Sequence, residues 1–295
     1  MNRQPQLRRF RVAAAAVSAV AMVTAACGGD DSTKQEASPA AQAPASAVEI
    51  MATDYGFEAG PAKVAAGPVA LTLANRGTEN HHLTLLRVND GTRVDDVLAG
   101  LRKGDLSVLA RTSAVGGPNG VAPGAKVTVT ADLSAGSYVM VCHIPSPQDS
   151  VSHAQKGMVG SFTVDGPTSA PVAAAPAVTG TITIAKSGYQ VPAGVGSGSY
   201  RFVNELDQPA EAALVRLRPG ATAKDVMAFL GGQAPPGPPP FSSAGGITTL
   251  APRASAVTTL DLPKGSYALL SFAPDLAGGG RPQFLSGLLT ELTVS

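Results

Sequence analysis

The sequence predicts an all-β protein that consists of two similar β-sandwiches in tandem. Its 295 residues include 33 glycines and 24 prolines but no tryptophan, which is typical of many turns and short strands. Apolar residues make up 44% of the chain, enough to build two modest cores. The net charge is +1 and the body of the chain has no sustained basic run, so we expect no nucleic-acid partner.

The first 26 residues are typical of a signal peptide. Four arginines between positions 3 and 11 precede an apolar run at 12–23, which is too short to span a bilayer. The small residues that follow, TAAC, resemble the lipobox of bacterial lipoproteins, and this resemblance makes Cys27 the lipidated first residue of the mature chain. The alternative is ordinary cleavage that leaves a free thiol. Residues 27–47 are rich in Ala, Pro and Ser and predict a flexible tether, so we expect an extracytoplasmic protein held at the cell membrane by its lipid anchor.

An internal repeat divides the rest of the chain. The segment NRGTENHHLTLLRVNDGTRVDDVLAGL, which starts at Asn75, aligns without a gap with NELDQPAEAALVRLRPGATAKDVMAFL, which starts at Asn204. The same offset aligns DLSAGSYVMVCHIP with DLPKGSYALLSFAP. We call residues 48–165 the first repeat and residues 178–295 the second repeat. The stretch 166–177 between them lacks apolar periodicity and predicts a linker.

Apolar and polar residues alternate through most of each repeat, which predicts β-strands. In the first repeat the alternation covers residues 69–77 and 82–88, and in the second repeat it covers residues 181–185, 199–204 and 212–217. Short alternating strands separated by turns predict a sandwich of two sheets in each repeat.

One segment in each repeat departs from this alternation. Residues 92–103 and 222–230 show apolar residues at helical spacing, and each opens with a threonine followed three residues later by an aspartate, which is typical of a capped helix start. We therefore expect one short helix in each sandwich. Tyr138 and Tyr267 follow matching Gly-Ser pairs, and we interpret them as packing or corner residues with a structural role.

The cysteines and histidines are few and unevenly placed. If Cys27 carries lipid, Cys142 is the other of the two cysteines, so no internal disulfide can form, and either burial or metal ligation would explain it. The four histidines, at positions 81, 82, 143 and 153, all lie in the first repeat. Strand alternation places His82 on the opposite face from His81, where we expect it to be solvated, and turns His143 away from Cys142 as a surface or packing residue.

Three motifs of the first repeat resemble those of the cupredoxins, the family of plastocyanin and azurin. They are the approach to a strand at 75–81, the strand at 138–142, and the segment HAQKGMVGSFTV, which leads into a final strand. The resemblance implies a Greek-key β-sandwich for the first repeat and, through the internal repeat, for the second.

The resemblance also implies a site for one copper ion. At this site His81 and His153 are the imidazole ligands, Cys142 is the thiolate and Met158 is the axial thioether. A soft thiolate, two imidazoles and a weak thioether form the ligand set of blue-copper sites. Ten residues separate Cys142 from His153, more than in small blue-copper proteins. This departure from the family weakens the expectation of a rigid, tuned site and of fast electron transfer, while a long loop can still return His153 to a copper site.

The second repeat serves as an internal control for this site. The alignment places Ala210, Ser271, Gln283 and Leu288 at the positions of the four candidate ligands. A repeat that keeps its turns, tyrosine and helix without these residues indicates that the fold does not need them, which favours a metal site in the first repeat.

The sequence thus predicts a copper-binding lipoprotein of the cell envelope, which carries single electrons or holds copper and meets a redox or copper-donor protein. The alternative is a metal-free envelope module whose sandwiches bind a protein or polymer partner. We do not expect an enzyme, because four histidines are too few for the additional copper centres of multicopper enzymes and no Ser/His/Asp arrangement is indicated.

Overall fold

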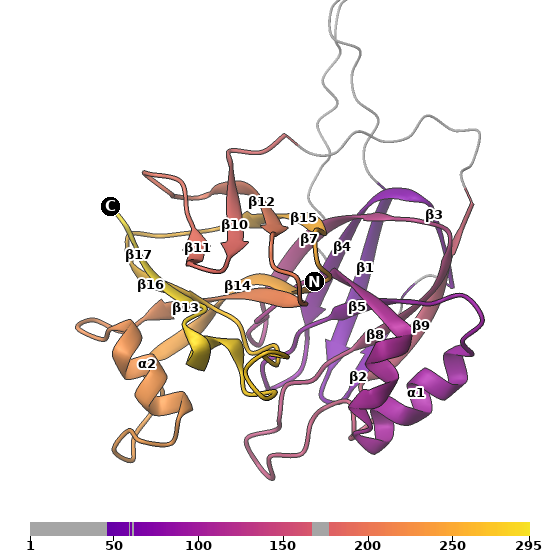
Figure 1. Ribbon diagram of the computed structural model, residues 1–295, viewed down its shortest axis with the longest axis horizontal. Helices are drawn as coiled ribbons and strands as arrows, with labels where there is room; N and C mark the ends of the chain where they lie inside the picture. The colour runs from indigo at the N-terminus through magenta and orange to yellow at the C-terminus, as the bar shows by residue number, and fades with distance from the viewer. Residues whose placement is uncertain (1–45, 59, 61, 167–176) are drawn as a thin grey trace, which may run out of the picture. The chain divides into compact units, whose positions relative to one another are not determined.

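The computed structural model of the protein describes residues 46–58, 60, 62–166 and 177–295 (Figure 1). The predicted signal peptide at 1–26, the predicted lipidation site Cys27, most of the tether at 27–47 and all but the two ends of the linker at 166–177 lie outside the described residues. Within the described ranges, no helix is both long and apolar enough to cross a membrane.

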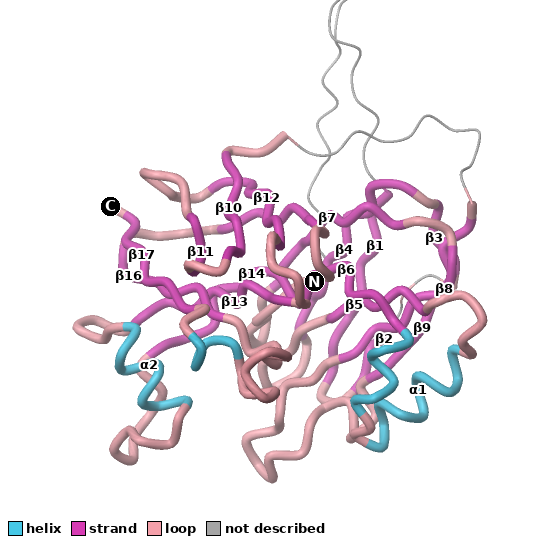
Figure 2. The backbone as a smooth tube through the Cα atoms, in the orientation of Figure 1, coloured by secondary structure: helices cyan, strands magenta, loops and turns pink. Residues whose placement is uncertain are grey.

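Strands dominate the described chain, and its helical segments are short (Figure 2). The strands form two mixed sheets, one of eight strands and one of nine. In the first sheet, for example, β1 (Ser46–Thr53) pairs in parallel with β4 (Gly67–Asn75), which pairs antiparallel with β7 (Lys126–Leu133). The prediction of an all-β fold is therefore confirmed.

The eight-stranded sheet has the order β11-β10-β12-β15-β7-β4-β1-β2. Its remaining strands are β2 (Gly56–Glu58), β10 (Gly180–Ala185), β11 (Gly188–Gln190), β12 (Gly198–Asn204) and β15 (Ser255–Leu260).

The nine-stranded sheet has the order β17-β16-β13-β14-β6-β5-β8-β9-β3. Its strands are β3 (Lys63–Ala65), β5 (Thr84–Val88), β6 (Thr112–Gly116), β8 (Gly136–Val141), β9 (Val159–Asp165), β13 (Ala210–Leu217), β14 (Phe241–Leu250), β16 (Gly265–Leu270) and β17 (Leu289–Val294).

Both sheets continue from the first repeat into the second. In the eight-stranded sheet β7 pairs antiparallel with β15, and in the nine-stranded sheet β6 meets β14 where Val115 lies opposite Leu250. One apolar cluster contains buried residues of both repeats, among them Leu71 and Phe202. The two repeats therefore share a core. Each repeat pairs with sheet edges of the other and covers apolar surface that would otherwise contact water.

The period-two pattern explains how the sheets bury their inner faces. Along β4, Val69, Leu71 and Leu73 are fully buried, whereas the residues between them are partly exposed. Side chains at every second position of a strand lie on the same face, so alternation in the sequence becomes one apolar face in the sheet.

One α-helix is inserted in each repeat, as predicted. The helix α2 (Ala223–Leu230) begins at Thr222, whose side chain and backbone exchange hydrogen bonds with Asp225 in a capping box. The helix α1 (Val94–Lys103) instead has Arg93 at its N-cap without a side-chain bond, because Thr92 lies in the preceding turn. Two short 3₁₀ helices, η1 (Leu106–Arg111) and η2 (Gln283–Ser286), complete the helical segments.

The two predicted corner tyrosines have the structural role expected of them. Tyr138 donates a hydrogen bond of 2.8 Å to the Ser134 carbonyl, and Tyr267 donates one of 2.6 Å to the Pro263 carbonyl. Both side chains are buried, so each phenol joins the core to the turn four residues earlier.

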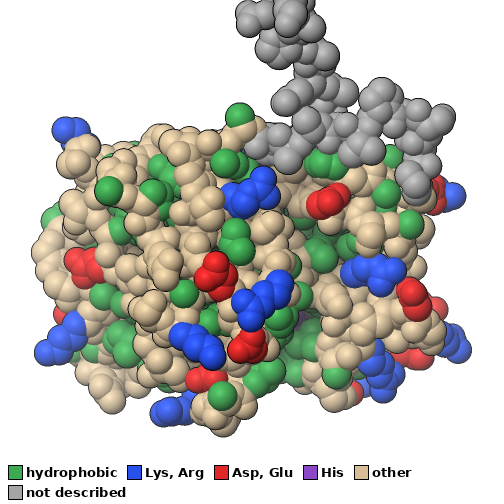
Figure 3. Space-filling model, turned by 45° about the horizontal axis from the view of Figure 1, so that its top comes forward, with side chains coloured by type: hydrophobic (Ala, Val, Ile, Leu, Met, Phe, Trp, Pro, Cys, Tyr) green, Lys and Arg blue, Asp and Glu red, His purple; other side chains and the backbone are tan. Residues whose placement is uncertain are grey.

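Acidic and basic side chains are interspersed on the face of the molecule drawn in Figure 3. No large area of one charge is visible on this face, in keeping with the net charge of +1.

Candidate metal centre

Three of the four predicted ligands lie together in the first repeat. Ring nitrogens of His81 and His153 and the Sγ atom of Cys142 all lie within 4.8 Å of one another. The two Nδ1 atoms are 3.1 Å apart, and the Cys142 Sγ lies 3.5 Å from the His153 Nδ1. All three side chains are fully buried.

Backbone hydrogen bonds hold these three residues and Met158 in place. His81 pairs with Val121 through two bonds of 3.0 and 2.8 Å. The Cys142 amide donates to the Met158 carbonyl at 3.2 Å, and the Met158 amide donates to the His153 carbonyl at 2.8 Å. Met158 is itself fully buried, so its backbone joins the two ligand-bearing segments from within the core.

The long connection between Cys142 and His153 forms a compact hairpin. Pro145 pairs with Ser152, and the Ser146 amide donates to the Val151 carbonyl at 2.9 Å. The additional residues therefore fold against one another, and His153 returns to the site.

Each histidine is anchored through its other ring nitrogen by a carboxylate. His81 Nε2 lies 3.2 Å from Asp54 Oδ1, and His153 Nε2 lies 2.8 Å from Glu79 Oε2. Since a carboxylate accepts hydrogen bonds, each Nε2 atom carries a proton, and the Nδ1 atom of a neutral ring then presents its lone pair to the site. Metal-ligating histidines are oriented by this kind of partner.

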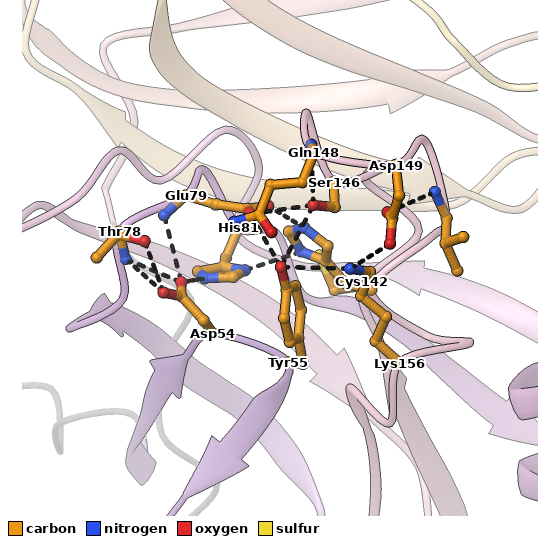
Figure 4. A network of polar contacts seen from close by, with 12 residues as sticks. Asp54, Tyr55, Thr78, Glu79, His81, Cys142, Ser146, Gln148, Asp149 and Lys156 are labelled. Carbon is orange, nitrogen blue, oxygen red and sulfur yellow. Dashed lines mark hydrogen bonds and ion pairs between the residues drawn. The ribbon is translucent and has the colours of Figure 1, made fainter.

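Glu79 is the centre of a network that reaches toward the surface (Figure 4). Its Oε1 accepts hydrogen bonds from Tyr55 at 3.0 Å and from Ser146 at 3.1 Å, while Gln148 donates at 3.5 Å. Burial alone would raise the pKa of Glu79, but the bonds from His153, Tyr55 and Ser146 outweigh it and leave the pKa below its ordinary value. The carboxylate is therefore ionised and keeps its acceptor role.

Asp54 has a similar role beside His81. Partial burial raises its pKa, but the Thr78 side chain, the amides of Thr78 and Glu79 and the ring of His81 lower it to about 2. Burial lowers the pKa of His81 in spite of the nearby Asp54 carboxylate. The imidazole is thus neutral near pH 7, the form that can bind a metal.

Tyr55 packs against the second imidazole from an unusual backbone position. Its ring meets that of His153 edge to face, with the centroids 5.2 Å apart. Its φ angle of 72° lies in the left-handed region, which costs a residue with a side chain about 1–2 kcal/mol. The turn between β1 and β2 holds this conformation and so keeps the phenol within reach of Glu79.

The Cys142 thiol is fully buried. Burial raises its pKa to about 12, although the His82 amide approaches the sulfur at 3.5 Å and opposes the shift. The thiol is therefore protonated in the metal-free protein, whereas a metal ion deprotonates a coordinating thiol outright.

The donor atoms fit a single soft or borderline metal ion. Metal–nitrogen bonds of about 2.0–2.1 Å and metal–sulfur bonds of about 2.3 Å place two donors on one ion roughly 3–4 Å apart. The Nδ1–Nδ1 separation of 3.1 Å and the separation of 3.5 Å between His153 Nδ1 and Cys142 Sγ fall in this range, and the remaining pair lies within 4.8 Å. One thiolate and two imidazoles suit copper or zinc better than magnesium or calcium.

The second repeat makes the same backbone contacts without the ligands. The Ser271 amide donates to the Leu288 carbonyl at 3.2 Å, and the Leu288 amide donates to the Gln283 carbonyl at 3.0 Å, as at the aligned positions of the first repeat. Ser271 Oγ donates to Gln283 Oε1 at 2.7 Å, and the side-chain Nε2 atom of Gln283 donates to the Pro209 carbonyl. A hydrogen bond between Ser271 and Gln283 therefore lies where the first repeat has the thiol and one imidazole, and Ala210 offers no donor atom at the position of His81.

The prediction that His82 is solvated is wrong. His82 is half-buried, and its Nε2 accepts a hydrogen bond of 2.8 Å from the His143 amide. Burial, with His143 as the next contribution, lowers the pKa of His82 to about 3. Residues 81–83 precede β5, so the alternation of a regular strand does not apply to them. His143 is also half-buried, in agreement with its interpretation as a packing residue.

Sequence reasoning missed Asp54, Tyr55 and Glu79. The strand pairings carry a signal that could have found the first two, because the turn that follows β10 places Lys186 and Ser187 where β1 is followed by Asp54 and Tyr55. Residues that are replaced together with the ligands in the second repeat are candidates for supporting those ligands.

Comparisons with known proteins give matches among solved structures alone; no protein-family model and no curated protein matches the chain. Reduced auracyanin from the photosynthetic bacterium Roseiflexus castenholzii is 23% identical, with a TM-score of 0.30 over 41% of this chain and 99% of that chain. Auracyanin A, a blue copper protein of Chloroflexus aurantiacus, is 15% identical, with a TM-score of 0.29 over 41% of this chain and 100% of that chain. A multicopper oxidase is 15% identical, with a TM-score of 0.22 over 84% of this chain and 88% of that chain. Such scores describe a partial likeness, so the candidate metal centre is described from the distances within this structure alone.

Proposed function

We propose that the protein is a cupredoxin-like copper-binding lipoprotein of the cell envelope that holds one copper ion and acts as a one-electron carrier or a copper holder. The ligands are His81, Cys142 and His153, with Met158 as the axial thioether. We propose that it is not an enzyme, and that its partner is a redox or copper-donor protein.

One observation carries the copper proposal. The two Nδ1 atoms lie 3.1 Å apart beside a buried thiol, while both Nε2 atoms are held by carboxylates. When both rings are neutral and each Nε2 atom carries its proton, two lone pairs face each other across this distance. An ion bound by both lone pairs replaces this unfavourable contact with two bonds, so the arrangement suits metal ligands better than ordinary core residues.

The burial of the donors bears on how the ion would be held. His81, Cys142, His153 and Met158 are all fully buried, so the protein excludes water from the site. Copper supplies one-electron redox chemistry when bound, and a dry, rigid site limits the rearrangement that accompanies a change of charge. Asp54 and Glu79 add two negative charges beside the imidazoles, which favours the more positive metal ion.

The second repeat supports the proposal through its differences. Its backbone hydrogen bonds match those of the first repeat at aligned residues, yet Ser271 and Gln283 occupy the positions of a thiol and an imidazole. We propose that the chain is a duplicated cupredoxin-like unit in which one copy has no copper site.

The location of the protein is part of the same proposal. The basic start, the short apolar run and the sequence TAACGG support export and lipidation at Cys27. Mass spectrometry of the protein from its membrane fraction tests this. We expect a mature chain that starts with lipidated Cys27. An unprocessed N-terminus would contradict this, as would an unmodified Cys27 thiol in the parent together with a Cys27→Ala variant that stays equally bound to the membrane.

A copper(II) titration of the purified protein tests the copper site. We expect one ion per chain and strong visible charge-transfer absorption from the thiolate. Cys142→Ser should abolish the absorption, and Ser271→Ala, a change at the aligned position of the second repeat, should leave it intact. Weak colour that does not depend on Cys142 would contradict the copper site and favour the metal-free module that binds a protein or polymer.

A further inference from the structure

The backbone of His81 has little support from its own sheet. His81 precedes β5 and lies outside every regular strand, so its two bonds to Val121 are its main-chain pairing. Two residues later, the Leu83 amide donates to the Pro118 carbonyl at 2.9 Å. The position of this histidine therefore depends on residues 116–121, which we call the bridging segment.

The bridging segment is held from its other side by the second repeat. The Thr248 amide donates to the Gly117 carbonyl at 2.9 Å, and the Asn119 amide donates to the Gly246 carbonyl at 3.4 Å. Pro118 pairs with Ile247 in an isolated bridge between these two bonds. The segment thus lies between the histidine and the end of β14.

Buried side chains strengthen the same contact. Thr248 Oγ1 donates to the Leu83 carbonyl at 3.2 Å, a direct bond from the second repeat to the chain beside His81. Asn119 Nδ2 lies 3.2 Å from both Glu211 Oε2 and the Ile247 carbonyl. Thr248, Asn119 and Glu211 are all buried, so water does not compete for these bonds.

The bridging segment packs closely against the chain on both of its sides. A Cβ atom at Gly117 would overlap the Leu83 carbonyl oxygen of the first repeat, and one at Gly120 would overlap the Ser243 Oγ atom of the second repeat. Both glycines also have positive φ angles, of 153° and 55°, which favour glycine. Because the packing is tight on both sides, a shift of the second repeat would move the segment that holds His81.

We propose that the second repeat positions the metal centre, with Thr248 and Asn119 as positioning residues that hold the bridging segment and thereby fix His81 beside His153. This inference rests on the proposed copper site. The second repeat, which has no ligands of its own, would thus support the metal site of the first repeat through the contact between the bridging segment and β14.

Thr258 provides a matched control. Its Oγ1 donates to the Thr128 carbonyl at 2.8 Å, so it also joins the two repeats by a buried hydroxyl-to-carbonyl bond. This bond lies between β15 and β7 in the other sheet, away from the bridging segment. Thr248→Val and Thr258→Val therefore remove the same kind of bond from two places.

The experiment measures copper affinity of the full chain by competition with a chelator, together with melting temperature and histidine-ring ¹⁵N NMR of the metal-free protein. We expect both variants to lower the melting temperature comparably. Thr248→Val should weaken copper binding about 10-fold and shift the NMR signals of the His81 ring. Loss of a residue that supports a metal ligand lowers metal affinity by about 10- to 100-fold, and we expect the lower value here. Thr258→Val should change neither, and Thr248→Ser should restore both.

The outcomes separate this inference from the copper proposal. If the parent chain binds no copper, the proposed function fails, while the NMR comparison still tests the positioning of His81. Equal effects of the two valine variants, or copper affinity and ring signals unchanged in both Thr248→Val and Asn119→Ala, would overturn the inference. Should Thr248→Val fail to fold, Asn119→Ala and Thr248→Ser decide the question.

Discussion

Glu79 is the residue on which the orientation of His153 depends. It accepts the Nε2 proton at 2.8 Å and is itself held by Tyr55 and Ser146. We expect Glu79→Ala to weaken copper binding by about 10- to 100-fold, because the ring loses the partner that fixes its tautomer. Competition titration measures this. Gln208→Ala, at the aligned position of the second repeat, should bind copper like the parent, and equal losses in the two variants would contradict the role of Glu79.

Glu211 makes a second residue-scale prediction, on stability. Burial raises its pKa to about 7, although the Phe272 amide and Asn119 oppose the shift. A raised pKa means that folding favours the protonated acid, so the contribution of Glu211 to stability is fully present below pH 4.5 and is lost as the pH rises from 4.5 through 7. The shift corresponds to a loss of roughly 3 kcal/mol, by order of magnitude.

Glu211→Gln removes this pH dependence. The difference in free energy of unfolding between the variant and the parent should shift in favour of the variant as the pH rises from 5 to 8. Denaturant titration at each pH measures it. Glu205→Gln, at an exposed site of the same repeat, should show no such gain. A constant difference between Glu211→Gln and the parent across this range would show that the carboxyl does not titrate as described.

The predictability of the site differs from residue to residue. The comparison of the repeats singles out His81, Cys142 and His153, because it contrasts them with residues that the same fold accepts. Asp54 and Glu79 could not be predicted from alternation, since they come from a turn and an irregular approach to a strand. The wrong prediction at His82 has the same cause, because the side chains alternate between the two faces only from Thr84, where β5 begins.

At the scale of elements, the two helices show how local signals act. Both have the threonine and aspartate spacing of a capping box, but the box forms at α2 alone. We expect Thr222→Ala to lower the free energy of unfolding by about 1 kcal/mol, since the helix loses its N-cap. Thr92 precedes the N-cap of α1, so Thr92→Ala should leave the free energy of unfolding nearly unchanged. Chemical denaturation measures both, and equal losses would contradict the assigned helix starts.

Strand positions were predictable within a few residues, and sheet order was not. Alternation at 69–77 and 212–217 corresponds to β4 (Gly67–Asn75) and β13 (Ala210–Leu217). Alternation states which face of a strand is apolar, but it does not state which strand lies beside it. The pairing of β7 with β15 therefore became visible only in the structure.

At the scale of the whole molecule, the repeats depend on each other. Removal of residues 166–295 would leave β6 without β14 and β7 without β15, and it would uncover part of the shared core. We expect a fragment of residues 46–165 to aggregate or to melt without cooperativity, because unpaired strand edges and exposed apolar surface favour association. Size-exclusion chromatography and thermal circular dichroism measure this. A monomeric fragment that melts as cooperatively as the full chain would contradict the shared core.

The measurement that tests the copper site most directly is a crystal structure of the copper-loaded protein with anomalous diffraction collected at the copper edge. We expect one anomalous peak in the first repeat, about 2.0 Å from the Nδ1 atoms of His81 and His153 and about 2.3 Å from the Cys142 Sγ, near the bond lengths usual for such donors. No peak is expected at Ser271 and Gln283. A peak at other residues, or none in a crystal grown with stoichiometric copper, would contradict the account.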